Sequence, residues 1–171
     1  LSGFSAGGRS LSAKHLLKNS KKLIILKAFT KLYGMAGVRL GYCLCSDTEL
    51  LARMRQRASV GGFQLAQAAG IAALDETEYV AKVRALIEAQ RPVLADGLRA
   101  LGLRVIEGRA NYLLFRAPEA LGEALRRKGA VLRSCGNYPA LMQLDRTAVR
   151  TENENRQLLA LLAETLPEVA Q

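Results

Sequence analysis

Several residue types are scarce in this chain of 171 residues. There are three cysteines, one histidine and no tryptophan, and aromatic residues make up only 5% of the sequence. The single histidine is His15 and no CxxC pair occurs, so we predict no metal site. Cys43, Cys45 and Cys135 form no disulfide framework and are predicted to be small buried hydrophobic residues. This usage is typical of a reducing compartment, and we expect a cytoplasmic protein.

Long hydrophobic runs are also missing. No stretch of about 18 apolar residues occurs, so we expect no membrane-spanning helix and no membrane partner. The start of the chain, LSGFSAGGRS, has no basic region followed by an apolar one, so we expect no signal peptide.

Negative charge is under-represented, with 15 Asp and Glu against 25 Lys and Arg and a net charge of +10. Such an excess can indicate nucleic-acid binding. Here the basic residues form short separate groups, and no aromatic residues lie between them as a base-stacking surface would require. We therefore expect no nucleic-acid partner, and anionic small molecules account better for some of the arginines.

The apolar half of the composition is arranged in alternating strands and helices. In the first part, Leu23–Phe29 and Gly41–Cys45 read as strands, and the run LIIL within the first predicts a buried strand. Asp47 is a suitable N-cap for a helix over Thr48–Arg57. The segment Gln64–Leu74 is apolar almost all round, so it predicts a buried helix.

The second part begins with a long helix from Glu76 to Leu101, which Pro92 should kink or divide and Gly102 should end. Further elements follow in the order β-β-α-β-β-α: Leu103–Ile106, Tyr112–Phe115, Leu121–Lys128, Val131–Arg133, Leu144–Val149, and a helix from Thr151 to about Leu166. Arg146 should break the fourth strand, and Glu154 completes a capping box with Thr151. The fold class is therefore α/β. We predict a domain boundary near residue 75, with domains over 1–75 and 76–171.

Lys31 follows the predicted buried strand and precedes a loop that contains Gly34 and Gly37. A lysine without solvation has a lowered pKa and a nucleophilic amine, as a Schiff base requires. Arg39 is suited to a phosphate, and the Thr30 hydroxyl adds a donor. Together they fit an aldehyde cofactor that carries a phosphate. The spacing alone is equally compatible with a surface loop of ordinary charges.

The segment AFTKLYGMAGVRLGY (28–42) resembles the lysine segment of class I/II pyridoxal-phosphate aminotransferases, [S/T]-x-[S/T]-K-x-x-G-x-x-G-x-R-x-G, and the histidinol-phosphate branch in particular. It matches at Lys31, Gly37, Arg39 and Gly41, whereas Ala28 replaces a serine that contacts the cofactor phosphate in many members. Further resemblance lies in LAQAAGIAALDETEY, in ANYLLFR (110–116), in VLRSCGNYPAL (131–141) and in RTAVRTENENRQLLALL (146–162). The resemblance covers about residues 1–165.

The resemblance implies a cofactor, pyridoxal 5'-phosphate, and a role for each matching residue. Lys31 would bind the cofactor aldehyde and move the substrate proton. Arg39 and Thr30 would hold its phosphate. Arg146 would bind the anionic group of the substrate, Arg133 the phosphate of a phosphorylated substrate, and Asn111 would help to position the carboxylate. The implied function is transamination between a phosphorylated amino substrate and a 2-oxo acid, in a homodimer.

The resemblance also implies a partial fold: the C-terminal part of the large cofactor domain, a long connecting helix and a small α/β domain. Family members are about twice as long and carry further cofactor-binding residues, so we expect a fragment that is inactive alone. Two alternatives stay open. The segments NYPAL and RTAVRT lean toward threonine-phosphate decarboxylase of cobalamin biosynthesis. A non-catalytic fragment that binds anions or a partner is the third reading.

Overall fold

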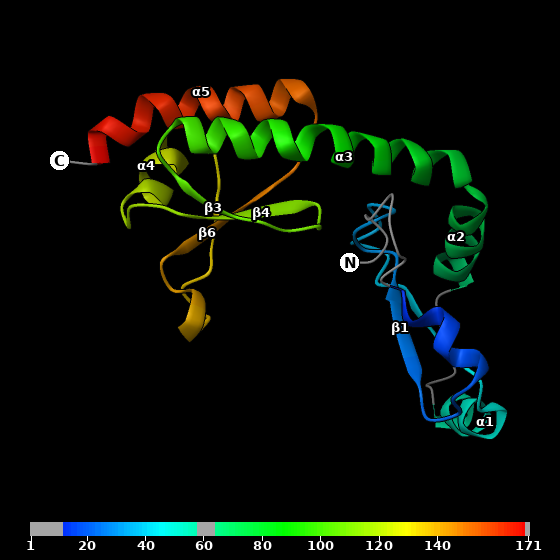
Figure 1. Ribbon diagram of the computed structural model, residues 1–171. Coiled ribbons are helices and arrows are strands. Elements are labelled where there is room, and N and C mark those ends of the chain that lie inside the picture. Colours follow the sequence, from blue (N-terminus) through cyan, green and yellow to red (C-terminus); the bar gives the residue numbers. More distant parts are fainter. Residues whose placement is uncertain (1–11, 58–63, 170–171) are drawn as a thin grey trace. The chain divides into compact units, whose positions relative to one another are not determined.

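The computed structural model describes residues 12–57 and 64–169, and both helices and strands occur in each part of the chain (Figure 1). The chain divides into two compact units between Val83 and Arg84, inside the helix α3 (Thr77–Ala100). Each unit therefore carries part of this helix. None of the helices in the described ranges combines the length and hydropathy that a bilayer crossing requires.

The first unit is built on one hairpin. Strands β1 (Ile24–Ala28) and β2 (Gly41–Cys45) pair antiparallel, from Ile24 opposite Cys45 to Ala28 opposite Gly41. The other elements of this unit are the 3₁₀ helix η2 (Ala13–Lys18), the helices α1 (Thr48–Arg57) and α2 (Gln64–Asp75), and the start of α3. The predicted N-cap of α1 is confirmed, because the Leu50 amide donates to Asp47 Oδ1 at 2.8 Å.

Two predictions of burial in this unit are wrong. In β1, Leu26 is 77% exposed, and in α2 Leu65 is 86% exposed. Gly70 is the one buried residue of α2. The physical reason is that a two-stranded sheet lacks enough layers to cover both its own faces and an apolar helix. Apolar composition indicated burial here, but the described residues supply no covering layer.

The second unit has the predicted β-β-α-β-β-α order. It contains β3 (Arg104–Ile106), β4 (Tyr112–Arg116), α4 (Leu121–Arg127), β5 (Arg133–Ser134), the 3₁₀ helix η3 (Pro139–Leu141), β6 (Leu144–Ala148) and α5 (Glu152–Val169). The four strands form an antiparallel sheet in the order β3-β4-β6-β5. The mixed α/β class is thus confirmed.

One face of this sheet packs against helices. Burial alternates along β4, where Leu113 and Phe115 are buried and their neighbours are not. The core also takes side chains from α3, α4 and α5, all fully buried: Leu94, Leu98, Leu121, Leu125 and Leu162. In Figure 1, α5 runs alongside the part of α3 that belongs to this unit. We call the other side, which carries Tyr112, Leu114 and Arg116, the open face.

The structure has the residues expected at several helix ends. Gly102, predicted to end the long helix, follows α3 with φ of 79°, and Gly129 follows α4 with φ of 87°, so both have the left-handed backbone of a helix stop. The capping box is also confirmed: the Glu154 amide donates to Thr151 Oγ1 at 3.4 Å, and the Thr151 amide donates to Glu154 Oε2 at 3.2 Å.

Two predicted interruptions are absent from the elements concerned. Helix α3 continues through Pro92 without division, since one lost amide in a 24-residue helix is outweighed by the packing of Leu94 and Leu98. Strand β6 is not broken by Arg146, because that side chain points to the open face and its backbone stays paired with β4 and β5.

Candidate active site

The predicted cofactor-binding residues lie together in the loop of the β1–β2 hairpin. The Phe29 amide donates to the Leu40 carbonyl at 3.2 Å, which extends the pairing one step beyond the strands. Thr30, Lys31 and Arg39 therefore belong to a loop whose two ends are held together.

The loop is anchored by an aromatic cluster. Phe29 is 3% exposed, and its ring centroid lies 5.2 Å from that of Tyr33 and 5.6 Å from that of Tyr42. Burial, and then the neighbouring Tyr33, raise the pKa of the Tyr42 hydroxyl above its ordinary value. A turn follows Lys31, whose carbonyl accepts from the amide of Gly34, and Gly34 has φ of 66°. The aromatic anchor thus positions the base of the loop directly beside Thr30 and Lys31.

Arg39 has an unusual backbone. Its φ is 54°, and it is the one non-glycine residue with positive φ among those described. This conformation costs an L-residue on the order of 1–3 kcal/mol and tends to occur at functional sites. The next strand then starts at Gly41, where an added Cβ would lie 2.8 Å from the Lys27 carbonyl oxygen. Glycine is needed there because the backbones approach too closely for a side chain.

Lys31 itself is exposed, as is Arg39, while Thr30 is half-buried. The desolvation expected from a buried strand is therefore absent for Lys31 in the described part of the chain. Neither Lys31 nor Arg39 has an acidic partner among the described residues. A lysine amine and a guanidinium in one loop, both uncompensated, suit an anionic aldehyde, so these residues fit pyridoxal phosphate.

The predicted substrate-binding residues lie in the second unit. Arg146 on β6 lies directly opposite Arg133 on β5, and both side chains are exposed on the open face. The Cζ atom of Arg146 lies 4.9 Å from the ring centroid of Tyr112. A cation over an aromatic ring is stabilised and held in orientation, so the ring of Tyr112 positions the Arg146 guanidinium.

Asn111 is half-buried immediately before β4. Its carbonyl accepts from the Val149 amide at 2.9 Å, and the preceding Ala110 carbonyl accepts from Arg91 Nη1 at 3.1 Å. Two hydrogen bonds from different elements therefore fix the backbone that carries Asn111.

The arginines of this unit differ in their partners. Several arginines are paired with acids, as Arg99 is with Asp96, Arg150 with Glu154 and Arg156 with Glu152. Arg133 and Arg146 have no acidic partner among the described residues. Two adjacent guanidinium groups without an acidic partner suit a doubly charged anion.

The structure thus groups the predicted residues in two sets, each within one unit. Thr30, Lys31 and Arg39 share a loop, and Arg133 and Arg146 share a sheet face with Tyr112. Sequence reasoning missed the contribution of Tyr112, and it also missed Arg104 and Arg116, which lie opposite each other on β3 and β4. The signal was the alternation Tyr112, Leu114, Arg116 along one strand.

No group of three His, Cys, Asp or Glu side chains in the described ranges is placed to hold a metal ion.

Comparison with known proteins agrees with these features. Histidinol-phosphate aminotransferase of Anaeromyxobacter sp. (strain Fw109-5) is 38% identical over 155 residues, which cover 88% of this chain and 42% of that protein. The protein of the same name from Symbiobacterium thermophilum is 37% identical over 162 residues, covering 91% of this chain and 44% of that protein. The chain thus spans about two fifths of the length of these relatives.

A solved structure extends the similarity to the fold. The crystal structure of the histidinol-phosphate aminotransferase from Clostridium acetobutylicum matches with a TM-score of 0.86 and 27% identity, covering 94% of this chain and 51% of that chain. The partial aminotransferase fold predicted from the sequence is therefore confirmed. Residues 2–162 also match the family model for aminotransferase class I and II, and the chain belongs to that family.

Proposed function

We propose that this chain supplies the lysine-bearing and arginine-bearing parts of a pyridoxal-phosphate-dependent transaminase that acts on a phosphorylated amino substrate. The observation that carries the proposal is the Arg133–Arg146 pair, two guanidinium groups on one sheet face that have no acidic partner in the described part of the chain. The relatives that are 38% and 37% identical are named for a phosphorylated substrate, which supports this reading.

Each residue contributes a specific task. When bound, pyridoxal phosphate supplies an electron sink for the carbon that carries the amino group. Lys31 provides the amine that binds the cofactor aldehyde and that takes and returns the proton of that carbon. Arg39 binds the cofactor phosphate, and the Thr30 hydroxyl donates a hydrogen bond to it.

The second unit binds the substrate. The Arg146 guanidinium, held over the ring of Tyr112, binds an anionic group of the substrate through two parallel N–H donors. Arg133 adds the second positive charge that a phosphate requires. Asn111 orients the carboxylate of the amino-acid partner. The 2-oxo acid co-substrate uses the same arginines when the amino group is transferred, and we propose that the complete site works in a homodimer.

Covalent labelling tests whether Lys31 binds pyridoxal phosphate. The chain is incubated with pyridoxal phosphate, reduced with borohydride and mapped by peptide mass spectrometry. We expect the label on Lys31, its loss in Lys31→Ala, and no loss in the control Lys21→Ala, which changes another exposed lysine. A label spread over surface lysines and unchanged in Lys31→Ala would contradict the assignment.

Calorimetry on the same chain tests whether Arg133 and Arg146 bind a phosphorylated substrate. Histidinol phosphate should bind at least tenfold more tightly than histidinol, and Arg133→Gln and Arg146→Gln should each remove most of that difference. Equal affinity for both compounds would contradict a phosphorylated substrate.

The reaction type is tested by products. With the full-length protein, we expect the amino group to reach 2-oxoglutarate, whereas release of CO₂ from threonine phosphate would favour the decarboxylase alternative.

A further inference from the structure

We propose that the open face carries a second anion site, formed by Arg104 and Arg116, which binds the phosphate of a small phosphate monoester with an apolar body. The two residues lie directly opposite each other on β3 and β4. Their Cβ atoms are therefore about 5 Å apart, on the same side of the sheet. This site does not depend on the proposed transaminase function.

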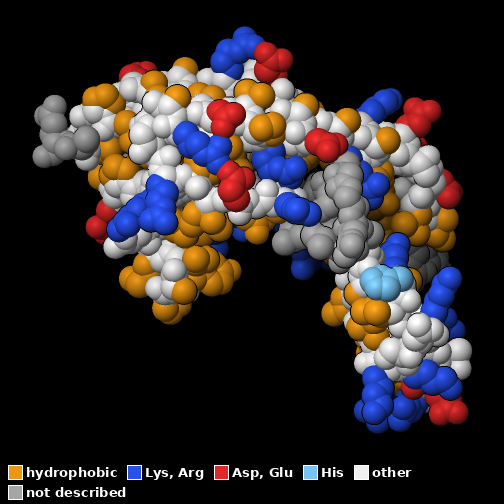
Figure 2. Space-filling view, in the orientation of Figure 1, with side chains coloured by type: hydrophobic (Ala, Val, Ile, Leu, Met, Phe, Trp, Pro, Cys, Tyr) orange, Lys and Arg blue, Asp and Glu red, His pale blue; other side chains and the backbone are white. Residues whose placement is uncertain are grey.

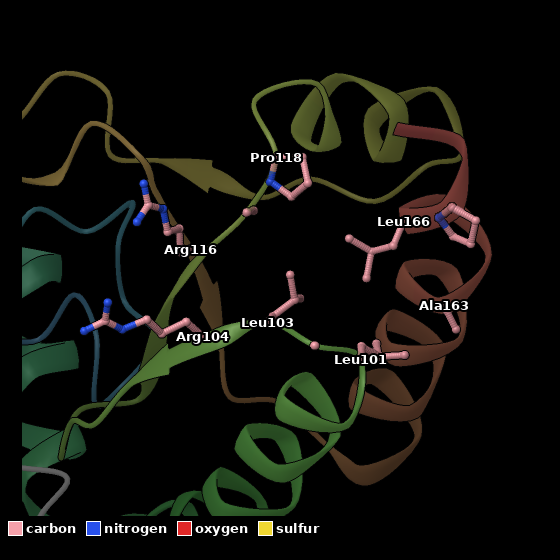
Figure 3. Close-up of a pocket in the computed structure, with 10 residues that line it drawn as sticks. Leu101, Leu103, Arg104, Arg116, Pro118, Ala163 and Leu166 are labelled. Atoms are coloured by element: carbon pink, nitrogen blue, oxygen red, sulfur yellow. The ribbon is translucent and has the colours of Figure 1, made fainter. Parts of the chain in front are cut away.

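The two guanidinium groups are oriented together. Figure 3 shows both extending to the same side of their strands, away from Leu101, Ala163 and Leu166. Arg116 also donates from Nη2 to the side-chain oxygen of Gln143, which restrains one of the two. Neither arginine has an acidic partner among the described residues. Like charges placed opposite each other disfavour folding, so a bound anion would relieve a cost that the chain otherwise carries.

A cavity of about 430 Å³ adjoins the pair. It is lined by Arg104, Arg116 and Gln143 on the polar side and by Ile106, Leu141 and Met142 on the apolar side. Met142 is 65% exposed and Ile106 41% exposed, so this apolar surface is open to a ligand. In Figure 2, hydrophobic side chains gather over the segment around η3. The cavity can therefore hold an apolar group next to the arginines.

The charge of the pair selects the ligand class. One guanidinium is enough to bind a carboxylate in a bidentate manner. Two guanidinium groups match a phosphate monoester, which carries a charge of about −1.5 to −2 at neutral pH. The ligand is thus a phosphate monoester rather than a simple carboxylate.

The site is separate from the Arg133–Arg146 pair. Across the open face, one row of opposite residues reads Arg104, Arg116, Leu144, and the next reads Ile106, Leu114, Arg146, Arg133. Arg116 and Arg146 are diagonal neighbours on β4 and β6, about 7–8 Å apart, but the two pairs share no residue. Each pair can therefore be removed without changing a residue of the other.

The test is an NMR titration of the full chain, labelled with ¹⁵N, at constant ionic strength. Phenyl phosphate, inorganic phosphate and benzoate are the probes. We expect saturable shifts at the amides of Arg104, Arg116 and Gln143, with phenyl phosphate binding at least threefold more tightly than inorganic phosphate and benzoate at least tenfold more weakly. Arg104→Gln and Arg116→Gln should each weaken phenyl phosphate binding about tenfold.

Matched variants complete the design. Arg127→Gln removes another exposed arginine of the same unit and should leave these shifts unchanged. Arg104→Lys keeps the charge and should recover part of the affinity. The proposal is overturned if the shifts do not saturate, if they persist in the folded Arg104→Gln/Arg116→Gln variant, or if benzoate binds as tightly as phenyl phosphate. Retained spectral dispersion in each variant establishes that it is folded.

Discussion

Arg133 lies directly opposite Arg146 across β5 and β6, with both side chains on the open face of the sheet. Opposite positions on neighbouring strands are close enough for side chains to interact, and like charges there are unfavourable. Four arginines in the described ranges are paired with acids, namely Arg99, Arg126, Arg150 and Arg156, and neither member of this pair is among them. The stability of the sheet therefore does not account for the pair, which is consistent with the anion binding proposed for it.

Arg133→Gln should therefore stabilise the free chain while it weakens anion binding. We expect a gain of about 0.2–1 kcal/mol in the free energy of unfolding at low salt, measured by urea denaturation. Because both residues are exposed, screening should reduce the gain at 1 M salt. Arg127→Gln serves as the control and should change little. Destabilisation at low salt would show that repulsion does not dominate at this position.

Gly97→Ala should destabilise the second unit. An added Cβ at Gly97 in α3 would lie 2.4 Å from Cδ1 and 2.9 Å from Cδ2 of Leu159 in α5. Such overpacking typically costs about 1–3 kcal/mol. Gly122→Ala in α4 is the matched control, because nothing lies within 4 Å of its Cβ, and it should stabilise by about 0.5 kcal/mol. Thermal unfolding of both variants measures the difference, and equal effects would contradict the packing of α3 on α5.

Asp145→Asn should stabilise the chain at neutral pH. Asp145 lies opposite Phe115 on β6, and burial raises the pKa of its carboxyl above 3.8. The folded state then holds the proton more tightly than the unfolded state, so stability falls as pH rises through the folded pKa. The variant should match the wild type below about pH 3 and exceed it at pH 7. Urea midpoints across this range test the sign, and a less stable variant at pH 7 would contradict it.

Glu154→Gln should have the opposite dependence on pH. The hydrogen bonds from the Thr151 hydroxyl and amide, with a contribution from Arg150, lower the pKa of Glu154 below its ordinary value. The carboxylate therefore stabilises the fold above its unfolded pKa, and that contribution is lost as pH falls through the folded pKa. The variant should be less stable at pH 7 and equal to the wild type in acid. Glu119→Gln, on an exposed residue, is the control, and equal losses in both would argue against the cap.

Sequence patterns predicted the second unit better than the first. The signals in the second unit are local and depend only on neighbouring residues. They are the alternation of buried residues in β4, the glycines after α3 and α4, and the capping box at Thr151. Burial in the first unit was predicted wrongly because it depends on layers that lie elsewhere, as the exposure of Leu65 shows. Residue type and position identified Lys31 and Arg39 as candidates, and the family resemblance implied Arg146. The pairing of Arg133 with Arg146 and the ring of Tyr112 depend on strand register, which composition does not encode.

The alternation of β6 has a consequence for which insertions and deletions the chain tolerates. Losing Asp145 would turn the positions that follow in β6 to the opposite face. The Arg146 guanidinium would then enter the apolar core beside Phe115, where a buried charge is costly. Length changes in the segment from 135 to 143 leave this alternation intact, so natural variants of the chain should differ in length there and not within β6.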